Sequence, residues 1–170
     1  MPETPRIITD QEATNITRVE ELTYELKIEE VMTEDPSVVS PETAMDEILE
    51  IFRKKRISGT PVVANGQLVG IVSIEDLIRC LKANDLNSSV SKYMSTKLLT
   101  IRKTDPVIEA LKLFVNSHFG RLPVLDEQDN LCGIITKGDI TSGILKALQH
   151  DYQEEEIRRY RASHLFEDIV

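Results

Sequence analysis

The feature that most restricts the fold of this chain is an internal repeat of about 62 residues. Shifting the sequence by 62 positions, and by 63 after one extra residue in the second copy, superposes ten identical residues. In the first copy these are Met32, Glu47, Leu49, Phe52, Pro61, Val62, Leu68, Gly70, Ile71 and Asp76, and in the second they are Met94, Glu109, Leu111, Phe114, Pro123, Val124, Leu131, Gly133, Ile134 and Asp139. A unit this short buries too little apolar surface to be stable alone, so the two copies are expected to pack together as one body.

Each copy predicts the same order of elements, which is strand, helix, strand, strand, helix. A short extended run comes first, at 37–40 in one copy and 98–101 in the other. A helix is expected next. Thr43 followed by Asp46 resembles a capping box, and Asp105-Pro106 resembles an N-cap with proline at the first helical position. Apolar residues recur beyond both points at helical spacing, which indicates one buried face on each helix.

A hairpin and a second helix complete each copy. Asn65-Gly66 joins two apolar runs in the first copy and is typical of a tight hairpin, whereas the second copy has the longer turn DEQDN. The second helices are expected to begin near Ser73 and Thr136. Both hairpin strands are too apolar to face water on either side, so the two copies are expected to pack sheet to sheet. The predicted fold is an α+β body of two β-α-β-β-α repeats with pseudo-twofold symmetry.

Segments outside the repeats predict further helices. Residues 17–30 open with a Thr-x-x-Glu capping box and carry an apolar stripe. Apolar residues at helical spacing also continue from Ile140 to Tyr160, accompanied by pairs of Glu and Arg four residues apart. The predicted organisation is an N-terminal arm and helix (1–30), two repeats (31–86 and 87–147) and a C-terminal connector helix (148–170).

Charge and hydropathy exclude several classes of partner. The chain has a net charge of -9, from 29 acidic and 20 basic residues, so it lacks the broad cationic face that nucleic acids and anionic membranes require. No stretch approaches the ~18 apolar residues of a membrane span, and the first residues lack the pattern of a secretory signal, so we expect a cytoplasmic protein. Cys80 and Cys132 lie within apolar patterns, as small buried thiols do in a reducing compartment.

No catalytic or metal centre is predicted. His150 and Glu154 are spaced to share a helix face as metal ligands, but no third candidate has a sensible spacing. Cys80 or Cys132 with His118 would form a nucleophile and base only by chance, because neither cysteine lies in a sequence environment expected to activate it. We therefore expect a protein that is not an enzyme.

The most similar parts of the two copies are GIVSIED, at 70–76, and GIITKGD, at 133–139. Serine or threonine followed three residues later by aspartate is typical of a helix N-terminus and requires no ligand. The same geometry also suits a nucleotide, because free N–H groups at a helix N-terminus bind phosphate and a carboxylate accepts hydrogen bonds from ribose hydroxyls. The motif alone leaves both interpretations open.

Residues 31–147 resemble a tandem pair of CBS domains, the Bateman module. The resemblance depends on VMT, PVV and GIVSIED in the first copy and on YMS, PVL and GIITKGD in the second. Proteins of this family typically bind adenosine-containing ligands (AMP, ADP, ATP, S-adenosylmethionine or dinucleotides) in clefts between the copies, and regulate an attached or partner protein. The resemblance implies a regulatory nucleotide sensor. The alternative is an interaction scaffold that pairs through its helices and has lost its ligand.

The resemblance also implies roles for individual residues. Asp76 and Asp139 would hold ribose, and Ser73 and Thr136 would lie beside ribose or phosphate. Thr33 and Ser95 would contact the ligand near the first strand. The adenine would be bordered by Ile71, Ile134 and the backbone around Gly59-Thr60 and Arg121-Leu122. Both copies keep the aspartate and the hydroxyl, so neither cleft is excluded.

The basic run RKKR at 53–56 has two interpretations in this context. Arg56 aligns with His118 just before the TPVV and LPVL strands, where basic side chains of the family reach over ligand phosphates, and Arg121 lies close by. The cations of 53–55 fall in the last turn of a helix, where they complement its macrodipole, and we expect them to do little else. The cluster as a whole would attract anions locally in an otherwise acidic protein.

The helices outside the repeats predict an assembly. The apolar stripes on 17–30 and 140–160 have no partner within the predicted body, which favours a homodimer through helical faces. The helix that begins near Asp139 continues into 148–170, so a ligand in that cleft would bias its direction. We expect this helix to connect the module to an output domain.

Overall fold

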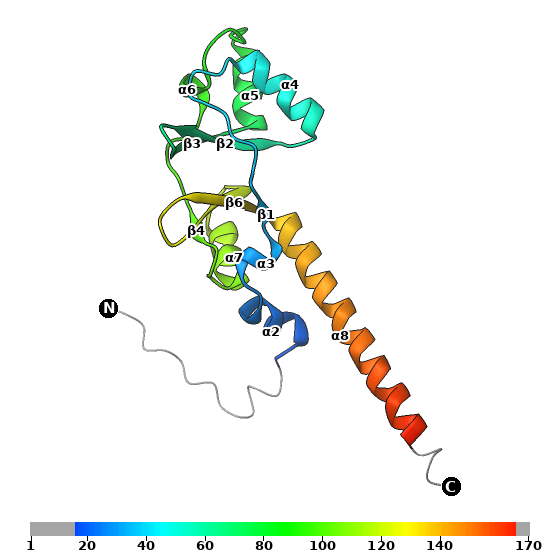
Figure 1. Cartoon of the computed structure of the whole chain (residues 1–170). Coiled ribbons are helices and arrows are strands. Elements are labelled where there is room, and N and C mark those ends of the chain that lie inside the picture. The colour runs from blue at the N-terminus through cyan, green and yellow to red at the C-terminus, as the bar shows by residue number, and fades with distance from the viewer. Residues whose placement is uncertain (1–15, 166–170) are drawn as a thin grey trace.

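The computed structural model describes residues 16–165. The predicted N-terminal arm at 1–15 and the last five residues, 166–170, lie outside the described residues, as does the side chain of Tyr160. Two small sheets face each other in the middle of the molecule, and helices cover the outer side of each sheet (Figure 1). This arrangement confirms the predicted sheet-to-sheet packing of two α+β repeats.

The first repeat forms a two-stranded sheet covered by helices. Its strands are β2 (Gly59–Ala64) and β3 (Gln67–Ser73), joined at Asn65 and Gly66 as predicted. Its helices are α4 (Met45–Lys55) and α5 (Ile74–Lys82), and α6 (Val90–Tyr93), which comes from the second repeat, packs with them. They enclose a core that includes Ile48, Val62 and Leu77, each at most 1% exposed.

The second repeat forms a four-stranded sheet in the order β1-β6-β5-β4. These strands are β4 (Ile101–Arg102), β5 (Arg121–Leu125), β6 (Leu131–Thr136) and, from the first repeat, β1 (Thr33–Glu34). The helices α7 (Val107–Asn116) and α8 (Lys137–Leu165) follow β4 and β6 in the chain. A second core includes Val107, Leu122 and Ile135, all fully buried.

A pair of exchanged strand segments joins the two repeats. Thr33 of the first repeat pairs with Ile134 on the last strand of the second, and Ser95 of the second repeat pairs with Ile71 on the last strand of the first. The glycines that precede Ile134 and Ile71 leave room for this crossing. A Cβ on Gly70 would lie 2.7 Å from the Met94 sulfur, and a Cβ on Gly133 would collide with the Met32 sulfur. The repeated methionines and glycines therefore belong to one pseudo-twofold packing motif.

The first strand of each repeat is shorter than predicted. The run at 37–40 makes only an isolated parallel bridge, between Val39 and Val62. Its counterpart at 98–101 contributes only its last residue to β4. Each segment therefore pairs with its sheet over one residue only.

Two predicted helix caps are wrong by one residue. Ala44 and Pro106, rather than Thr43 and Asp105, are the cap residues of α4 and α7. Loop carbonyls already accept from the first N–H groups of these helices: Met45 N donates to Ser88 O at 2.9 Å, and Val107 N donates to Leu26 O at 2.8 Å. Tertiary hydrogen bonds thus replace the side-chain caps that local sequence suggested.

The predicted helix at 17–30 is divided into α2 (Arg18–Glu25) and α3 (Ile28–Val31). The Thr17–Glu20 capping box at its start is confirmed. The break occurs where the chain pairs with the loop before α7, since Ile28 N donates to Asp105 O at 2.9 Å. Among the apolar residues of α2, Leu22 is buried, but Val19 is 45% exposed.

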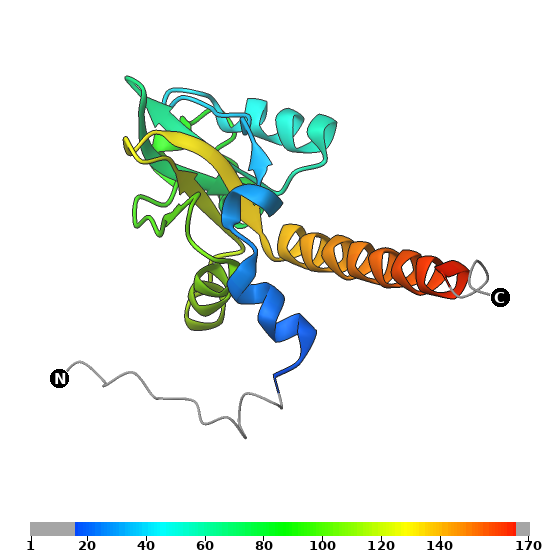
Figure 2. The same cartoon turned by 60° about the horizontal axis from the view of Figure 1, so that its bottom comes forward.

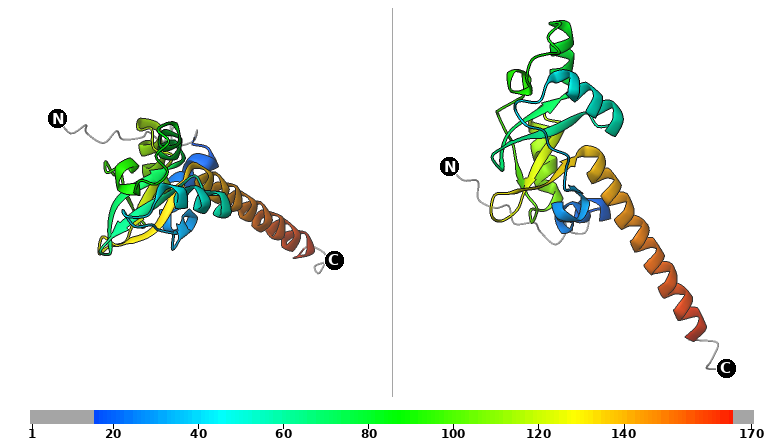
Figure 3. Two further views of the ribbon diagram at one scale, coloured as in Figure 1. Left: turned by 90° about the horizontal axis from the view of Figure 1, so that it is seen from above. Right: turned by 45° about the horizontal axis from the view of Figure 1, so that its top comes forward.

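The long C-terminal helix is confirmed as one continuous element, α8. Its first turns join the core through Ile140, and it then extends away from the body (Figures 1 and 2). Arg18 on α2 contacts it through a 2.8 Å ion pair with Asp151. No helix among residues 16–165 is long and apolar enough to cross a bilayer. Seen from above, the two repeats form a rounded body from which α8 projects (Figure 3).

Candidate functional site

Two clefts lie between the repeats, one on each side of the pseudo-twofold axis. The cleft that contains Asp139 has a volume of about 480 Å³, and the cleft that contains Asp76 has a volume of about 630 Å³. We call them the Asp139 cleft and the Asp76 cleft. Each combines the end of the last strand and the start of the last helix of one repeat with a loop and strand of the other.

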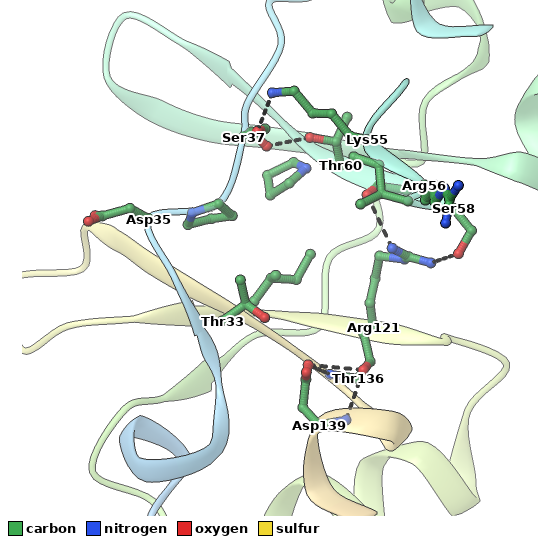
Figure 4. Close-up of a pocket in the computed structure, with 15 residues that line it drawn as sticks. Thr33, Asp35, Ser37, Lys55, Arg56, Ser58, Thr60, Arg121, Thr136 and Asp139 are labelled. Carbon is green, nitrogen blue, oxygen red and sulfur yellow. Dashed lines mark hydrogen bonds between the residues drawn. The ribbon is translucent and has the colours of Figure 1, made fainter. Parts of the chain in front are cut away.

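The Asp139 cleft has its polar floor at the N-terminus of α8 (Figure 4). The Asp139 carboxylate accepts hydrogen bonds from Thr136 N at 2.8 Å and from the Thr136 hydroxyl at 2.9 Å. Both bonds reach the same oxygen, Oδ2. The first repeat supplies the opposite wall, and Thr33 and Ile134 also line the cleft. The arrangement presents a carboxylate, a hydroxyl and an apolar side chain to a common space.

Cations of the first repeat lie across this cleft from Asp139. Arg56 ends α4 in the left-handed conformation, with φ of 53°, and its exposed side chain lines the cleft. Lys55 also lines it and donates to the Ser37 hydroxyl at 2.5 Å. The expectation that Lys55 only complements the helix macrodipole is therefore wrong. The neighbouring Lys54 does not line the cleft.

Thr60 and Gly59 form the strand wall of the Asp139 cleft. The Thr60 side chain is 1% exposed, and its hydroxyl donates to the Ser37 carbonyl oxygen. This bond commits the hydroxyl proton to the protein, so Thr60 can meet a ligand only as an acceptor or through its backbone.

The Asp76 cleft repeats the floor with one addition. Asp76 Oδ2 accepts from Ser73 N at 2.7 Å and from the Ser73 hydroxyl at 3.0 Å. The other oxygen, Oδ1, accepts from Arg79 Nη2 at 2.5 Å, and Arg79 also donates to the Tyr93 carbonyl oxygen at 2.9 Å. The position equivalent to Arg79 in the second repeat is Ser142, so the second repeat places no cation three residues after Asp139. The two carboxylates therefore differ in how much of their acceptor capacity is already used.

The second repeat supplies the opposite wall of the Asp76 cleft through His118 and the residues that follow it. Ser95 and Ile71, the exchanged pair, also line this cleft. Phe119 and Gly120 occupy the positions equivalent to Ile57 and Ser58 in the other cleft. The Asp76 cleft thus offers an aromatic side chain where the Asp139 cleft offers an aliphatic one.

Arg121 lines both clefts. Its Nη1 donates to the Gly59 carbonyl oxygen at 3.1 Å, and its Nη2 donates to the Ser58 hydroxyl at 2.5 Å. Burial lowers the pKa of the Arg121 guanidinium from its ordinary value. An arginine stays charged under such a shift, so a cation stands between the clefts.

The structure brings the predicted site residues together, with one exception. The Asp139 cleft contains Thr33, Arg56, Gly59, Thr60, Arg121, Ile134, Thr136 and Asp139, and the Asp76 cleft contains Ile71, Ser73, Asp76, Ser95, His118 and Arg121. Leu122 lines neither cleft, because its side chain points into the core of the second repeat and is fully buried. The roles assigned to the other residues stay predictions.

Sequence reasoning missed several residues that line the clefts, among them Asp35, Ser37, Lys55, Ser58, Glu75, Arg79 and Phe119. A signal existed for Arg79, which lies three residues after Asp76 on the same helix and so faces it. A signal also existed for Ser58, which falls in the small-residue turn before β2. No pattern indicated Asp35 or Ser37, which enter the cleft because the chain crosses between the repeats.

Outside the clefts, the two cysteines and His150 are the candidates for reactive or metal-binding chemistry that the sequence offered. Desolvation raises the pKa of both Cys80 and Cys132, which disfavours a thiolate nucleophile. Cys80 is buried as expected, whereas Cys132 is only half-buried. His150 lies 3.8 Å from Glu154 on an exposed face of α8, and no group of three metal-ligating side chains occurs among the described residues.

Comparisons with known proteins identify the family. A crystal structure of CBSX2 in complex with AMP is 30% identical and has a TM-score of 0.63, over 71% of this chain and 97% of that chain. CBSX2 is a CBS-pair protein from Arabidopsis thaliana.

Curated relatives are longer than the region they share with this chain. The uncharacterized protein MJ1232 of Methanocaldococcus jannaschii is 31% identical over 68% of this chain but only 38% of its own length. An inosine-5'-monophosphate dehydrogenase of Aquifex aeolicus is 34% identical over 72% of this chain and 25% of its own length. Residues 28–83 and 90–146 each match the family model described as the CBS domain. This chain therefore belongs to the CBS domain family and contains a tandem pair of its domains.

Proposed function

We propose that this chain is a regulatory module that binds adenosine-containing nucleotides in its two clefts and transmits their occupancy to an attached or separate output domain. One observation carries the proposal. Each cleft joins an aspartate and a hydroxyl at a helix N-terminus of one repeat to basic side chains of the other repeat. The ligand class comprises AMP, ADP, ATP and S-adenosylmethionine, and the AMP complex of CBSX2 supports it. The module itself carries out no catalysis in this proposal.

The chemistry of each cleft fits a nucleoside. A carboxylate accepts the two hydrogen bonds that the 2′ and 3′ hydroxyls of ribose donate, and this is the role we give to Asp76 and Asp139. Ser73 and Thr136 lie beside them, within hydrogen-bonding distance of each carboxylate. Ile71 and Ile134 supply apolar surface for adenine, next to Ser95 and Thr33.

The basic side chains are placed to meet phosphate. Arg56 and Lys55 serve the Asp139 cleft, His118 serves the Asp76 cleft, and Arg121 borders both. Arg79 also lines the Asp76 cleft, but it contacts the Asp76 carboxylate. In a chain of net charge -9 these groups form a local site for anions rather than a surface for nucleic acid.

Thermal unfolding with added nucleotides tests the proposal. A ligand that binds only the native state raises the unfolding temperature, by a free energy of about 2.7 kcal/mol when its concentration is 100 times Kd. Adenosine, AMP, ADP, ATP and S-adenosylmethionine are compared with GMP, which carries the same ribose phosphate on a different base. A shift with the adenosine compounds but not with GMP supports adenine recognition. No shift with any of them at millimolar concentration contradicts the proposal.

A second candidate function is an interaction scaffold that binds no nucleotide. The observation that favours it is the capping geometry itself, since Asp76 and Asp139 are hydrogen-bonded to Ser73 and Thr136 without any ligand. The same nucleotide series separates the two candidates, because a scaffold would show no shift but would still associate.

We also propose that the module forms a homodimer through its helices. Apolar side chains are exposed on α5 (Ile74, Ile78 and Leu81) and on α8 (Leu145, Tyr152 and Ile157). Static light scattering at tens of micromolar tests this proposal, and a mass equal to one chain, 19.3 kDa, would refute it.

Finally, we propose that α8 is the connector to the output domain, which acts in the cytoplasm. The helix begins one residue after Thr136 and contains Asp139, so occupancy of the Asp139 cleft acts directly on its first turn. Deletion of 151–170 would then abolish regulation while leaving nucleotide binding intact. Unchanged regulation after the deletion would contradict the connector role.

A further inference from the structure

We propose that the two clefts compete for the guanidinium of Arg121, so that a phosphate held in one cleft weakens the binding of a phosphate in the other. The inference rests on the proposed nucleotide-binding function and adds a coupling between the sites. It predicts that a charged nucleotide bound in one cleft weakens the binding of a second charged nucleotide in the other cleft. Neutral adenosine should bind the two clefts independently.

The partition between the clefts is one hydrogen-bonded pair. Ser58 and Arg121 each line both clefts, and they are joined by the 2.5 Å bond from Arg121 Nη2 to the Ser58 hydroxyl. Figure 4 shows the Arg121 side chain extending from β5 across to Ser58 at the start of β2. A ligand in either cleft therefore meets the same guanidinium.

The repeat provides only one such cation for two sites. The position equivalent to Arg121 in the first repeat is Gly59, and the position equivalent to Ser58 in the second repeat is Gly120. A Cβ on Gly59 would lie 2.6 Å from Arg121 Nε and 2.7 Å from Cζ. A second long side chain at Gly59 cannot share this space, so the site at the axis is occupied from one repeat alone.

Counting donors shows why the clefts cannot both use this group fully. A guanidinium has five N–H donors. Two of them are committed to Gly59 O and the Ser58 hydroxyl, which leaves three. A bidentate grip on phosphate needs two donors, and two such grips need four. The first phosphate bound can take a bidentate contact, and the second then finds at most one donor on a cation that is already neutralised.

The other cations cannot relieve this competition, because each belongs to one cleft. Lys55 and Arg56 line only the Asp139 cleft, while Arg79 and His118 line only the Asp76 cleft. Their contribution is therefore the same whether or not the other cleft is filled. Coupling between the clefts falls on Arg121.

Calorimetric titration of the full chain with AMP and with adenosine tests the inference. The Asp139→Ala variant, which loses the ribose contact of its cleft, gives the affinity of the Asp76 cleft when the other is empty. In the wild type, AMP is expected to bind the Asp76 cleft about tenfold more weakly once the Asp139 cleft is filled, a coupling of ordinary size. Adenosine is expected to bind it equally well in both proteins. Two adenosines but one AMP per chain would be the extreme form of the same result.

Three variants separate shared use of Arg121 from simple repulsion between phosphates. Arg121→Gln removes the charge and shortens the side chain while keeping a polar amide, and it is expected to reduce the AMP coupling to about threefold or less. Ser58→Ala keeps the charge and frees the N–H that Arg121 donates to the Ser58 hydroxyl. Four donors are then available for two phosphates, so the coupling should fall as well. Arg53→Gln makes the same exchange on an exposed side chain outside both clefts and should leave the coupling unchanged.

The outcomes distinguish this inference from the function on which it rests. Equal coupling for adenosine and AMP, or an AMP coupling that survives both Arg121→Gln and Ser58→Ala, overturns the inference while the nucleotide-binding function stands. Failure of the wild type to bind either compound overturns both. Thermal unfolding of each variant without ligand shows whether it is folded, and Ser58→Ala still decides the matter if Arg121→Gln is not.

Discussion

Replacing Asp139 by alanine should weaken adenosine and AMP to the same extent at its cleft, because the lost contact lies on the ribose that both share. A hydrogen bond to a charged group contributes about 1.5–3 kcal/mol. Loss of that contribution corresponds to about a ten- to hundredfold rise in Kd. The assay is calorimetric titration of the variant with both ligands, under the conditions used for the wild type.

The same substitution has a cost to stability that must be measured beside affinity. Asp139 Oδ2 accepts from both the backbone N–H and the hydroxyl of Thr136, at 2.8 and 2.9 Å. Loss of such a contact at a helix start typically costs about 1 kcal/mol. Asp76→Ala should cost slightly more, because Asp76 also accepts from Arg79, although an ion pair whose arginine is 63% exposed adds at most about 1 kcal/mol. Urea unfolding without ligand measures both losses.

A basic residue across the cleft supplies the contrast. Arg56→Ala should leave adenosine binding unchanged, weaken AMP and weaken ATP most, because the guanidinium faces phosphate alone in our proposal. The difference should shrink at high salt, which screens an exposed charge. Lys54→Ala is the matched control, because Lys54 belongs to the same basic run but does not line the cleft. Equal losses of adenosine and ATP affinity in Arg56→Ala would refute the reasoning and leave RKKR as a helix terminus only.

Three further predictions concern stability. Gly133→Ala should destabilise the fold by about 1–3 kcal/mol in urea unfolding, because the new methyl meets the Met32 sulfur and lies 3.0 Å from the Thr33 carbonyl oxygen, whereas Gly120→Ala, with no atom within 4 Å, should not. Leu122→Ala should cost about 2–5 kcal/mol as a core truncation, against about 0.5 kcal/mol or less for the exposed Leu145→Ala. Hydrogen bonds from Lys92, Ser88 and Tyr93 lower the pKa of Asp85 below its ordinary value of 3.8, so its contribution to stability is present above that pH and is lost as the pH falls below it. The unfolding temperature of Asp85→Asn should therefore fall less steeply than that of the wild type between about pH 4 and pH 2, and equal slopes would contradict this assignment.

The sequence predicted the parts of the fold that short-range patterns determine. The period of the repeat, the hairpin at Asn65-Gly66, the helix starts at Ser73 and Thr136 and the single long helix α8 all follow from local composition and spacing. They are confirmed because contacts between neighbouring residues favour each of them, although Ile74 N at the start of α5 also donates to the distant Ser58 carbonyl oxygen at 2.8 Å. The Ser73 and Thr136 boxes, for example, close within four residues.

The predictions that are wrong concern backbone groups satisfied from a distance. Thr43 and Asp105 look like caps, but the helices beside them begin one residue later, because carbonyls of Ser88 and Leu26 take the free N–H groups. The helix at 17–30 breaks for the same reason. Ile28 N donates to the Asp105 carbonyl oxygen, which lies 77 residues further along the chain. No local sequence pattern relates these two residues. Local rules cannot predict a bond whose partner is placed by the tertiary fold.

The candidate site shows the same division between local and distant information. The aspartates and hydroxyls of the two floors were predicted because each pair lies on one helix turn. Lys55 was assigned only to the helix macrodipole, although it reaches Ser37 over the cleft. The backbone around Arg121 and Leu122 was predicted to border the adenine, but only Arg121 lines a cleft. Side chains alternate along β5, and that of Leu122 is buried in the core of the second repeat.

The two clefts differ where the repeats are not identical. The identities at Gly70, Ile71 and Asp76 and their counterparts build two floors of the same shape, which is why the sequence alone treats the clefts as equivalent. Their surroundings have diverged at several aligned positions, and three of these matter most here: Arg79 corresponds to Ser142, Ser58 to Gly120, and Gly59 to Arg121. In the first repeat, Arg79 binds Oδ1 of Asp76 while Ser73 binds Oδ2, so both oxygens of this carboxylate accept hydrogen bonds. In the second repeat Ser142 replaces the arginine, and the hydrogen bonds from Thr136 reach Oδ2 of Asp139 alone. The other two place a single guanidinium on the boundary between the clefts. In our proposal, two like floors and one shared cation would make the two clefts respond to different concentrations of the same charged ligand.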